Sequence, residues 1–229
     1  MIGLPIILIG TSLSEHGALG TNATAISVLA AILAIWAVMR GTAHWKEGLA
    51  FAIPGLIGAY FGTQLGLAFP GRKLIFILGL VVFAEAAWMF WLSTRKKPLF
   101  SGPPSPQPHH FRRRAFGLVP MGVVVGWVSG FFAVGAGFMI VIALMLGGRL
   151  PVRLASQTAL IPIALFTGLE GGRYAMAGHV QLAPAACIFV TGALSGAIGV
   201  ALADRAPRRL LQRVLGALFV LIGVNFLVR

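Results

Sequence analysis

Glycines interrupt one apolar run of this chain, and the interruption has the chemistry to bind an anion. The run that starts at Phe116 is broken at Gly135-Ala136-Gly137 and resumes at Phe138. A helix that breaks inside lipid leaves backbone N–H groups unpaired, so they must face protein or a water-filled cavity. The resumed helix presents free N–H groups and a partial positive charge. Gly135, Gly137 and Phe138 are therefore candidate substrate-binding residues; close helix packing is the alternative role for the same glycines.

Four uncharged polar residues occupy matching places in the two halves of the chain. They are Thr21, Asn22, Gln157 and Thr158. Hydroxyl and amide groups donate hydrogen bonds to an oxyanion without the desolvation cost of a full charge. We interpret all four as candidate substrate-binding residues. Because they come near the starts of predicted helices, helix capping is the alternative role.

Three ionisable residues lie inside apolar runs, where charges are costly and usually functional. Glu85 is in the middle of the run 74–92, whereas Glu170 and Arg173 share one predicted helix face at i,i+3 spacing. We consider all three for ion coupling. The alternative for Glu170 and Arg173 is mutual neutralisation near a membrane surface. Ile222 stands opposite Glu85 in the other half, which argues against a symmetric role for this glutamate.

No residue pattern predicts catalysis, a metal site or a cofactor. His16, His44 and His179 lie in or beside polar turns, and no His-Glu-x-x-His or similar pairing occurs. A membrane-embedded enzyme would need histidines and acids that converge within the bilayer. We therefore predict no catalytic residues and no metal or cofactor.

The composition excludes a soluble globular domain. Hydrophobic residues make up 58% of the 229 residues and charged residues 10%, and the mean hydropathy is +0.93. Soluble domains are about 45–50% apolar and about 25% charged. The net charge of +13 comes from 18 Lys and Arg against five acids. These basic residues cluster at predicted helix ends and in one linker, which indicates lipid headgroups and topology rather than nucleic acid.

Apolar runs predict an all-α polytopic membrane protein of about seven spanning segments, each needing about 20 apolar residues. The runs cover residues 2–13, 18–39, 49–69, 74–92, 116–134 with 138–147, 154–176, 180–203 and 210–228. Between residues 94 and 115 the chain holds five prolines and two basic clusters, which predicts an exposed linker. The predicted organisation is therefore a first membrane unit at 1–93, a linker at 94–115 and a second unit at 116–229.

The two units align without a gap at an offset of 137, which predicts an internal repeat of the kind common in secondary transporters. Residues with specific backbone or polar roles coincide: Gly10 with Gly147, Thr21 with Thr158, Gly41 with Gly178, Gly55 with Gly192, Gly62 with Gly199, Pro70 with Pro207, Arg72 with Arg209 and Gly79 with Gly216. Met1 aligns with Phe138, so we expect the first unit to lack its initial helix, through either a start codon placed too late or a shortened chain.

The order of these motifs resembles the sulfite exporter TauE/SafE family of membrane permeases (4-toluene sulfonate uptake permease family). The resemblance rests on Ser129-Gly130, Gly135-Ala136-Gly137-Phe138, Ala155-Ser156-Gln157-Thr158, Ala18-Leu19-Gly20-Thr21-Asn22 and Pro5. It covers nearly the whole chain outside the linker. Two positions depart from the family pattern: Ile142 replaces the proline of the second unit, and Ala136 stands where a third glycine is usual.

The resemblance implies a multi-pass protein of the bacterial inner (plasma) membrane that transports a small anion. Sulfite, an organosulfonate or a related organic acid are the implied substrates. The implied partners are this anion and the lipid bilayer, with no nucleic acid, and a homo-oligomer is left open. The competing interpretations are a non-transporting or degenerate membrane subunit, supported by the expected missing helix, and a membrane-embedded enzyme.

Overall fold

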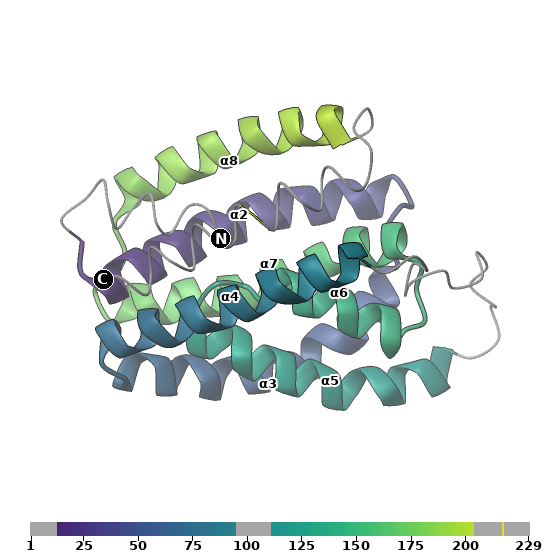
Figure 1. Cartoon of the computed structure of the whole chain (residues 1–229), viewed down its shortest axis with the longest axis horizontal. Helices are drawn as coiled ribbons and strands as arrows, with labels where there is room; N and C mark the ends of the chain where they lie inside the picture. The colour runs from purple at the N-terminus through teal and green to yellow at the C-terminus, as the bar shows by residue number, and fades with distance from the viewer. Residues whose placement is uncertain (1–12, 95–110, 204–216, 218–229) are drawn as a thin grey trace.

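The computed structural model describes residues 13–94, 111–203 and 217 of the chain (Figure 1). These residues form seven α-helices and, within the described ranges, no strand. The helices are α2 (Glu15–Met39), α3 (Trp45–Ala68), α4 (Gly71–Thr94), α5 (Phe111–Phe132), α6 (Gly137–Leu146), α7 (Val152–Met176) and α8 (Leu182–Ala203). The all-α prediction is confirmed for this part of the chain. Apart from residues 13 and 217, the predicted runs 2–13 and 210–228 lie outside it, as does Pro5.

Helix α5 begins earlier than the hydropathy pattern indicated. It starts at Phe111, inside the segment 94–115 that was predicted as linker, and α4 ends at Thr94. The last proline of that segment is Pro108, and the following arginines Arg112 to Arg114 are good helix formers. Helix propensity therefore extends α5 beyond its apolar stretch towards the membrane surface.

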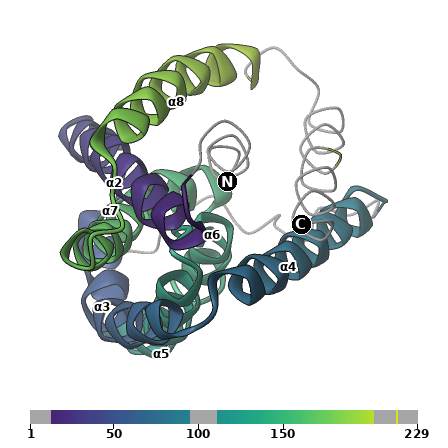
Figure 2. The same ribbon diagram turned by 90° about the vertical axis from the view of Figure 1, so that its left-hand side faces the viewer.

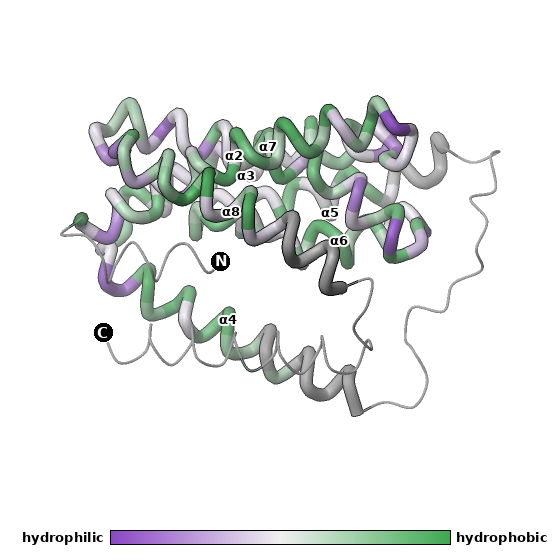
Figure 3. The backbone as a smooth tube through the Cα atoms, turned by 90° about the horizontal axis from the view of Figure 1, so that it is seen from above, coloured by the Kyte–Doolittle hydropathy of each residue, from purple (hydrophilic) through white to green (hydrophobic). Residues whose placement is uncertain are grey.

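Within the described ranges, three helices are long and apolar enough to cross a membrane: α2, α3 and α7, with 25, 24 and 25 residues. At 1.5 Å per residue each is about 36 Å long, which exceeds the hydrocarbon thickness of about 30 Å. Their outer faces expose large apolar side chains, including Ile35, Ile53 and Phe61. Hydrophobic residues occupy the middle of the helices, and hydrophilic residues lie near their ends (Figure 3).

Helices α3 and α5 run in parallel and touch backbone to backbone (Figure 2). A Cβ atom added to Gly122, Gly126 or Gly130 of α5 would overlap the carbonyl oxygens of Phe51, Gly55 and Ala59 in turn. In the other direction, Gly58, Gly62 and Gly66 of α3 lie against the carbonyl oxygens of Val123, Trp127 and Phe131. Glycines every four residues on both helices let the backbones approach closely, which is the main source of helix association in lipid.

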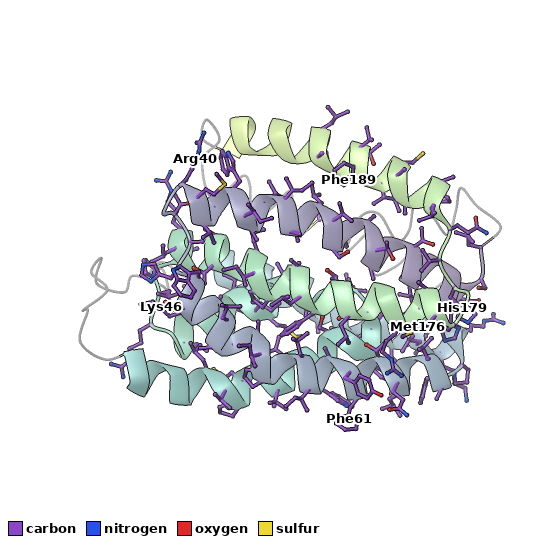
Figure 4. The ribbon with its side chains drawn as sticks, turned by 180° about the vertical axis from the view of Figure 1, so that it is seen from behind. Arg40, Lys46, Phe61, Met176, His179 and Phe189 are labelled. Atoms are coloured by element: carbon purple, nitrogen blue, oxygen red, sulfur yellow. The ribbon has the colours of Figure 1, made fainter. Side chains whose placement is uncertain are left out.

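Helices α2 and α7 pack in antiparallel orientation. Gly20, near the start of α2, lies against Tyr174 and the carbonyl oxygen of His179, and Gly171 lies against Thr24. The bundle therefore has two ends. At the linker end, α3, α5 and α7 begin, and α2 and α4 end; at the far end, α2, α4 and α8 begin, and α3 and α7 end. Figure 4 shows Arg40 and Lys46 at the linker end and Met176 and His179 at the far end.

Several features of the fold recur at the offset of 137 that relates the two halves. The bounds of α2 and α7 differ by 137 at both ends, and the starts of α3 and α8 differ by the same number. The turns that follow α2 and α7 contain Gly41 and Gly178 with φ of 66° and 75°. The counterparts of α4 and α6 fall outside the described residues, so the repeat stays a prediction.

A methyl group at the α3–α5 interface should destabilise the bundle. In Gly126→Ala the new Cβ overlaps the carbonyl oxygen of Gly55, which belongs to rigid backbone. We expect a loss of about 1–3 kcal/mol in the free energy of unfolding, measured as a lower thermal midpoint of the detergent-solubilised protein. The control is Gly196→Ala in α8, where nothing lies within 4 Å of the added Cβ. Equal midpoints for the two variants would contradict the interface.

Candidate functional site

Helices α5 and α6 form a helical hairpin. Gly147, which follows α6, lies against Leu118 and Met121 in the first half of α5. Helix α6 therefore runs back along α5 towards the linker end. The sequence predicted a helix that breaks and then continues; the structure instead reverses the chain between Phe132 and Gly137.

Left-handed backbone conformations produce the reversal. The φ angles are 51° at Ala133, 79° at Gly135 and 37° at Ala136. Glycine adopts this region freely, whereas an L-residue there costs about 1–2 kcal/mol. Ala133 is fully buried and Ala136 nearly so, so packing around the hairpin tip (residues 133–136) holds both alanines in a strained conformation.

The hairpin tip lies about halfway along α7. A Cβ atom on Gly135 would meet Thr167, and one on Gly137 would meet Ile163. These two α7 residues flank the midpoint of the 25-residue helix Val152–Met176. The first turn of α6 is thus placed deep in the bundle rather than at one of its ends.

The first turn of α6 has free hydrogen-bond donors. The first N–H that bonds within the turn is that of Ile140, to the carbonyl of Ala136 at 3.0 Å. Helix geometry leaves the N–H groups before it without an intrahelical partner, and the N-cap residue Ala136 offers no side-chain acceptor. Gly137 and Phe138 are half-buried. This turn can therefore accept an anion through backbone N–H groups and the partial positive charge of the helix.

Thr21 and Thr158 lie at opposite ends of the α2–α7 pair and bond to turns of the other half. The Thr158 hydroxyl accepts a hydrogen bond from the backbone N–H of His44 at 3.0 Å. The Thr21 hydroxyl accepts one from the N–H of Gln181 at 3.1 Å. His44 and Gln181 also differ by 137. Both threonines thus hold the N-terminal turn of a neighbouring helix, a capping role that crosses between the halves.

Asn22 and Gln157 form no hydrogen bond to the hairpin tip within the described structure. Asn22 is 1% exposed, and neither its Oδ1 nor its Nδ2 has a hydrogen-bond partner among the described residues. It lies on the side of α2 opposite Gly20 and Thr24, which contact α7, because two residues turn a helix by about 200°. Gln157 is half-buried next to Thr158 at the linker end. Of the predicted substrate-binding residues, Gly135, Gly137 and Phe138 lie together at the start of α6. Asn22 belongs to α2, whose residues Leu19 and Ala23 share a buried cluster with Ala133 of the tip.

Glu170 and Arg173 have separate partners. Glu170 is fully buried, and its Oε1 accepts a hydrogen bond from the Ser129 hydroxyl of α5 at 2.7 Å. Its Oε2 is buried and has no hydrogen-bond partner among the residues that the structure describes. The Arg173 guanidinium stacks over the Tyr60 ring with 4.2 Å between its Cζ and the ring centroid. The two residues form no salt bridge in the described structure, so mutual neutralisation does not explain them.

Two neighbours of Glu170 were not identified as functional from the sequence. The sequence indicates Ser129 only as part of the glycine-rich motif, and no sequence motif includes Tyr174. Tyr174 is fully buried one helical turn beyond Glu170, and its hydroxyl has no partner among the described residues. The i,i+4 spacing of Glu170 and Tyr174 was the available signal. Glu85 lies in α4, but its side chain falls outside the described part of the structure.

Known proteins resemble this chain in sequence over most of its length. The family model described as Sulfite exporter TauE/SafE matches residues 1–226. A protein of Xylella fastidiosa (strain 9a5c) named "Probable membrane transporter protein" is 28% identical over 227 residues, which cover 98% of this chain and 85% of the relative. "Probable membrane transporter protein YunE" of Bacillus subtilis is 20% identical over 195 residues, covering 81% of this chain and 71% of the relative. No solved structure matches.

The capping role of Thr158 predicts a stability effect. Thr158→Val keeps the shape of the side chain but leaves the half-buried His44 N–H without its acceptor, which costs about 1 kcal/mol, the lower end of the range for buried groups. Thr158→Ser keeps the hydroxyl and serves as the matched control. We expect the thermal midpoint in detergent to fall for the valine variant and to stay closer to wild type for the serine variant. If both variants match wild type, the hydroxyl does not hold the turn.

Proposed function

Because the chain belongs to the sulfite exporter TauE/SafE family, we propose that it is a secondary membrane transporter of a small anion. The membrane assignment follows from the family and the apolar helices, and the relatives that cover most of its length are named as membrane transporters. The sequence contains no nucleotide-binding motif, so an ion gradient or the substrate's own gradient supplies the energy. Sulfite, an organosulfonate or a related organic acid is the proposed substrate class.

The observation that carries the proposal is the first turn of α6, whose backbone N–H groups are free of intrahelical partners at the buried tip of the hairpin. Backbone N–H groups at a helix start bind oxyanions without a cationic side chain. Secondary transporters place such half-helix starts near the middle of the membrane, where they point at anionic groups of the substrate. Gly135 and Gly137 keep side chains away from the turn, and Phe138 belongs to it. In this proposal the bound anion is not in direct contact with four of the predicted residues: Thr21, Asn22, Gln157 and Thr158.

We further propose that the two halves, 1–93 and 116–229, are inverted repeats. Helices α2 and α7 correspond at the offset of 137 and run in opposite directions. In transporters of this design, the two repeats exchange conformations to open the site first to one side of the membrane and then to the other. The second repeat holds the α5–α6 hairpin, and the matching segment of the first repeat lies outside the described residues.

Charge supports one orientation in the bacterial inner (plasma) membrane. Arg40, Lys46, Arg149 and Arg153 lie at the linker end, where α4 ends beside Arg95-Lys96-Lys97 and α5 begins with Arg112 to Arg114. The far end carries Arg72, Lys73 and Arg173. Because basic residues favour the cytoplasmic side, we propose that the linker end faces the cytoplasm.

Flux into proteoliposomes tests the function and the site together. The purified protein should exchange at least one of sulfite, 4-toluenesulfonate, isethionate and acetate at a rate above that of protein-free liposomes. The variant Phe138→Asp puts a negative charge on the first turn of α6, and Phe138→Asn provides the same shape without the charge. Since like charges brought together cost several kcal/mol, we expect the aspartate variant to be at least about tenfold slower than the asparagine variant.

Two outcomes would contradict the proposal. If wild-type protein that is correctly folded exchanges none of the four anions, the transporter function for this substrate class is wrong. If the aspartate and asparagine variants exchange the same anion at equal rates, the anion does not bind at the first turn of α6.

Cysteine labelling tests the orientation. Cys187 is the only cysteine, so it is first replaced by alanine. Single cysteines are then introduced as Thr42→Cys at the linker end and Met176→Cys at the far end, where Met176 is 82% exposed. A membrane-impermeant maleimide added to intact cells should label the Met176→Cys protein, and it should label the Thr42→Cys protein only after lysis. The reverse pattern would invert the proposed orientation.

A further inference from the structure

A buried carboxyl group lies beside the hairpin. Glu170 is fully buried on α7, and its Oε2 has no hydrogen-bond partner within the described structure. Ser129, whose hydroxyl donates a hydrogen bond to Oε1 of Glu170, lies in the last turn of α5. The backbone carbonyl of Ser129 accepts a hydrogen bond from the N–H of Ala133 in the tip at 2.8 Å. Thr167, which contacts Gly135, lies three residues before Glu170. One hydroxyl therefore joins the carboxyl group to the segment that forms the hairpin tip.

Titratable side chains continue from Glu170 towards the far end. Tyr174 follows one turn later on the same face of α7 and is fully buried. The His16 ring of α2 stacks on the Tyr174 ring with 6.2 Å between centroids. The His179 ring, in the turn after α7, lies 5.6 Å from that of His16. Both histidines are half-buried, so this series connects the interior of the bundle with its surface.

The charged groups around this series lie mostly towards the far end. On α5, the side chain against Glu170 is Ser129, and on α3, Tyr60 lies under the Arg173 guanidinium. At the far end, α4 begins at Gly71 against Glu15 and His16, which places Arg72 and Lys73 near the two histidines. Among the described residues, no salt bridge involves Glu170. Within the described structure, the Ser129 hydroxyl is therefore the one group that forms a hydrogen bond to this carboxyl group.

We propose that Glu170 binds and releases a proton during transport. Tyr174, His16 and His179 lie between this carboxyl group and the far end. This inference rests on the proposed function. The Glu170 carboxylate combines with a proton from solution to give the neutral acid, and no other bond changes. A buried carboxyl group is far less costly when neutral. An anion at the start of α6 repels the carboxylate, so proton and anion bind together, and the protein is a proton–anion symporter.

Carbodiimide labelling tests the proton site without any substrate. Dicyclohexylcarbodiimide reacts with protonated carboxyl groups in apolar surroundings, and mass spectrometry of the intact, reconstituted protein locates the adduct. We expect Glu170 to be labelled at neutral pH, and labelling to decrease as the pH rises. Glu15 and Glu47 in the same sample are internal controls. Absence of an adduct on Glu170, or labelling that does not change with pH, would overturn the proposal.

Sulfite flux tests the coupling. With equal sulfite on both sides, an inward proton gradient should drive accumulation of labelled sulfite by the wild-type protein. Glu170→Gln mimics the neutral acid, so we expect it to retain sulfite exchange while its gradient-driven accumulation falls at least about tenfold, the size of a typical coupling. Ser129→Ala removes the hydroxyl but keeps the carboxyl group, and it should remain coupled with a shifted pH profile. Protein-free liposomes correct for passive entry of the protonated anion.

The outcomes separate the two proposals. Gradient-driven accumulation by Glu170→Gln at the wild-type level overturns the proton role and leaves the transporter function intact. Wild-type protein that exchanges no sulfite counts against sulfite as the substrate, and the carbodiimide result then decides the proton site by itself. Loss of exchange in a folded Glu170→Gln protein overturns coupling, because the residue would then be needed for anion binding or movement.

Discussion

The contact between α3 and α5 determines where the other elements lie. Glycines at four-residue spacing bring the two backbones together from Phe51 to Gly66, and no side chain separates them. This contact fixes the rotation of α5, which points Ser129 at α7 and sets the level at which the chain reverses. Since lipid provides no hydrophobic driving force between helices, close backbone packing has to supply the association. The position of the hairpin tip is therefore a consequence of glycines on a different pair of helices.

The hairpin shows how such a bundle tolerates non-helical backbone at depth. Irregular backbone is excluded from lipid, but it is allowed where protein surrounds it. The tip is buried against α7, and its left-handed alanines persist because the neighbouring contacts leave no alternative. The same burial keeps the first turn of α6 away from bulk water and from lipid. An anion there would meet oriented N–H groups in surroundings of low dielectric constant, where such interactions are strong.

Hydropathy and glycine spacing predicted the helices and the location of the break, because both follow from the local sequence. The direction of α6 could not be predicted in this way. A break at Gly135-Ala136-Gly137 fits a kink as well as a reversal, and the contact of Gly147 with Leu118 is needed to decide between them. The sequence also suggested that Thr21 and Thr158 share one site, since they correspond in the repeat. Antiparallel packing of α2 and α7 sends corresponding residues to opposite ends, and no linear pattern contains that information.

The reciprocal bonds of the two threonines have a consequence for synthesis of the protein. The acceptor for the His44 N–H lies 114 residues further along the chain, and Gln181 follows its acceptor Thr21 by 160 residues. A ribosome adding about 5–20 residues per second needs several seconds to cover the first interval. During that time the turn after α2 is already made, while its tertiary partner does not yet exist. The insertion machinery or the lipid headgroups must provide hydrogen-bond partners for that turn until the second half is synthesised. Maturation of the first half therefore ends only after translation of the second.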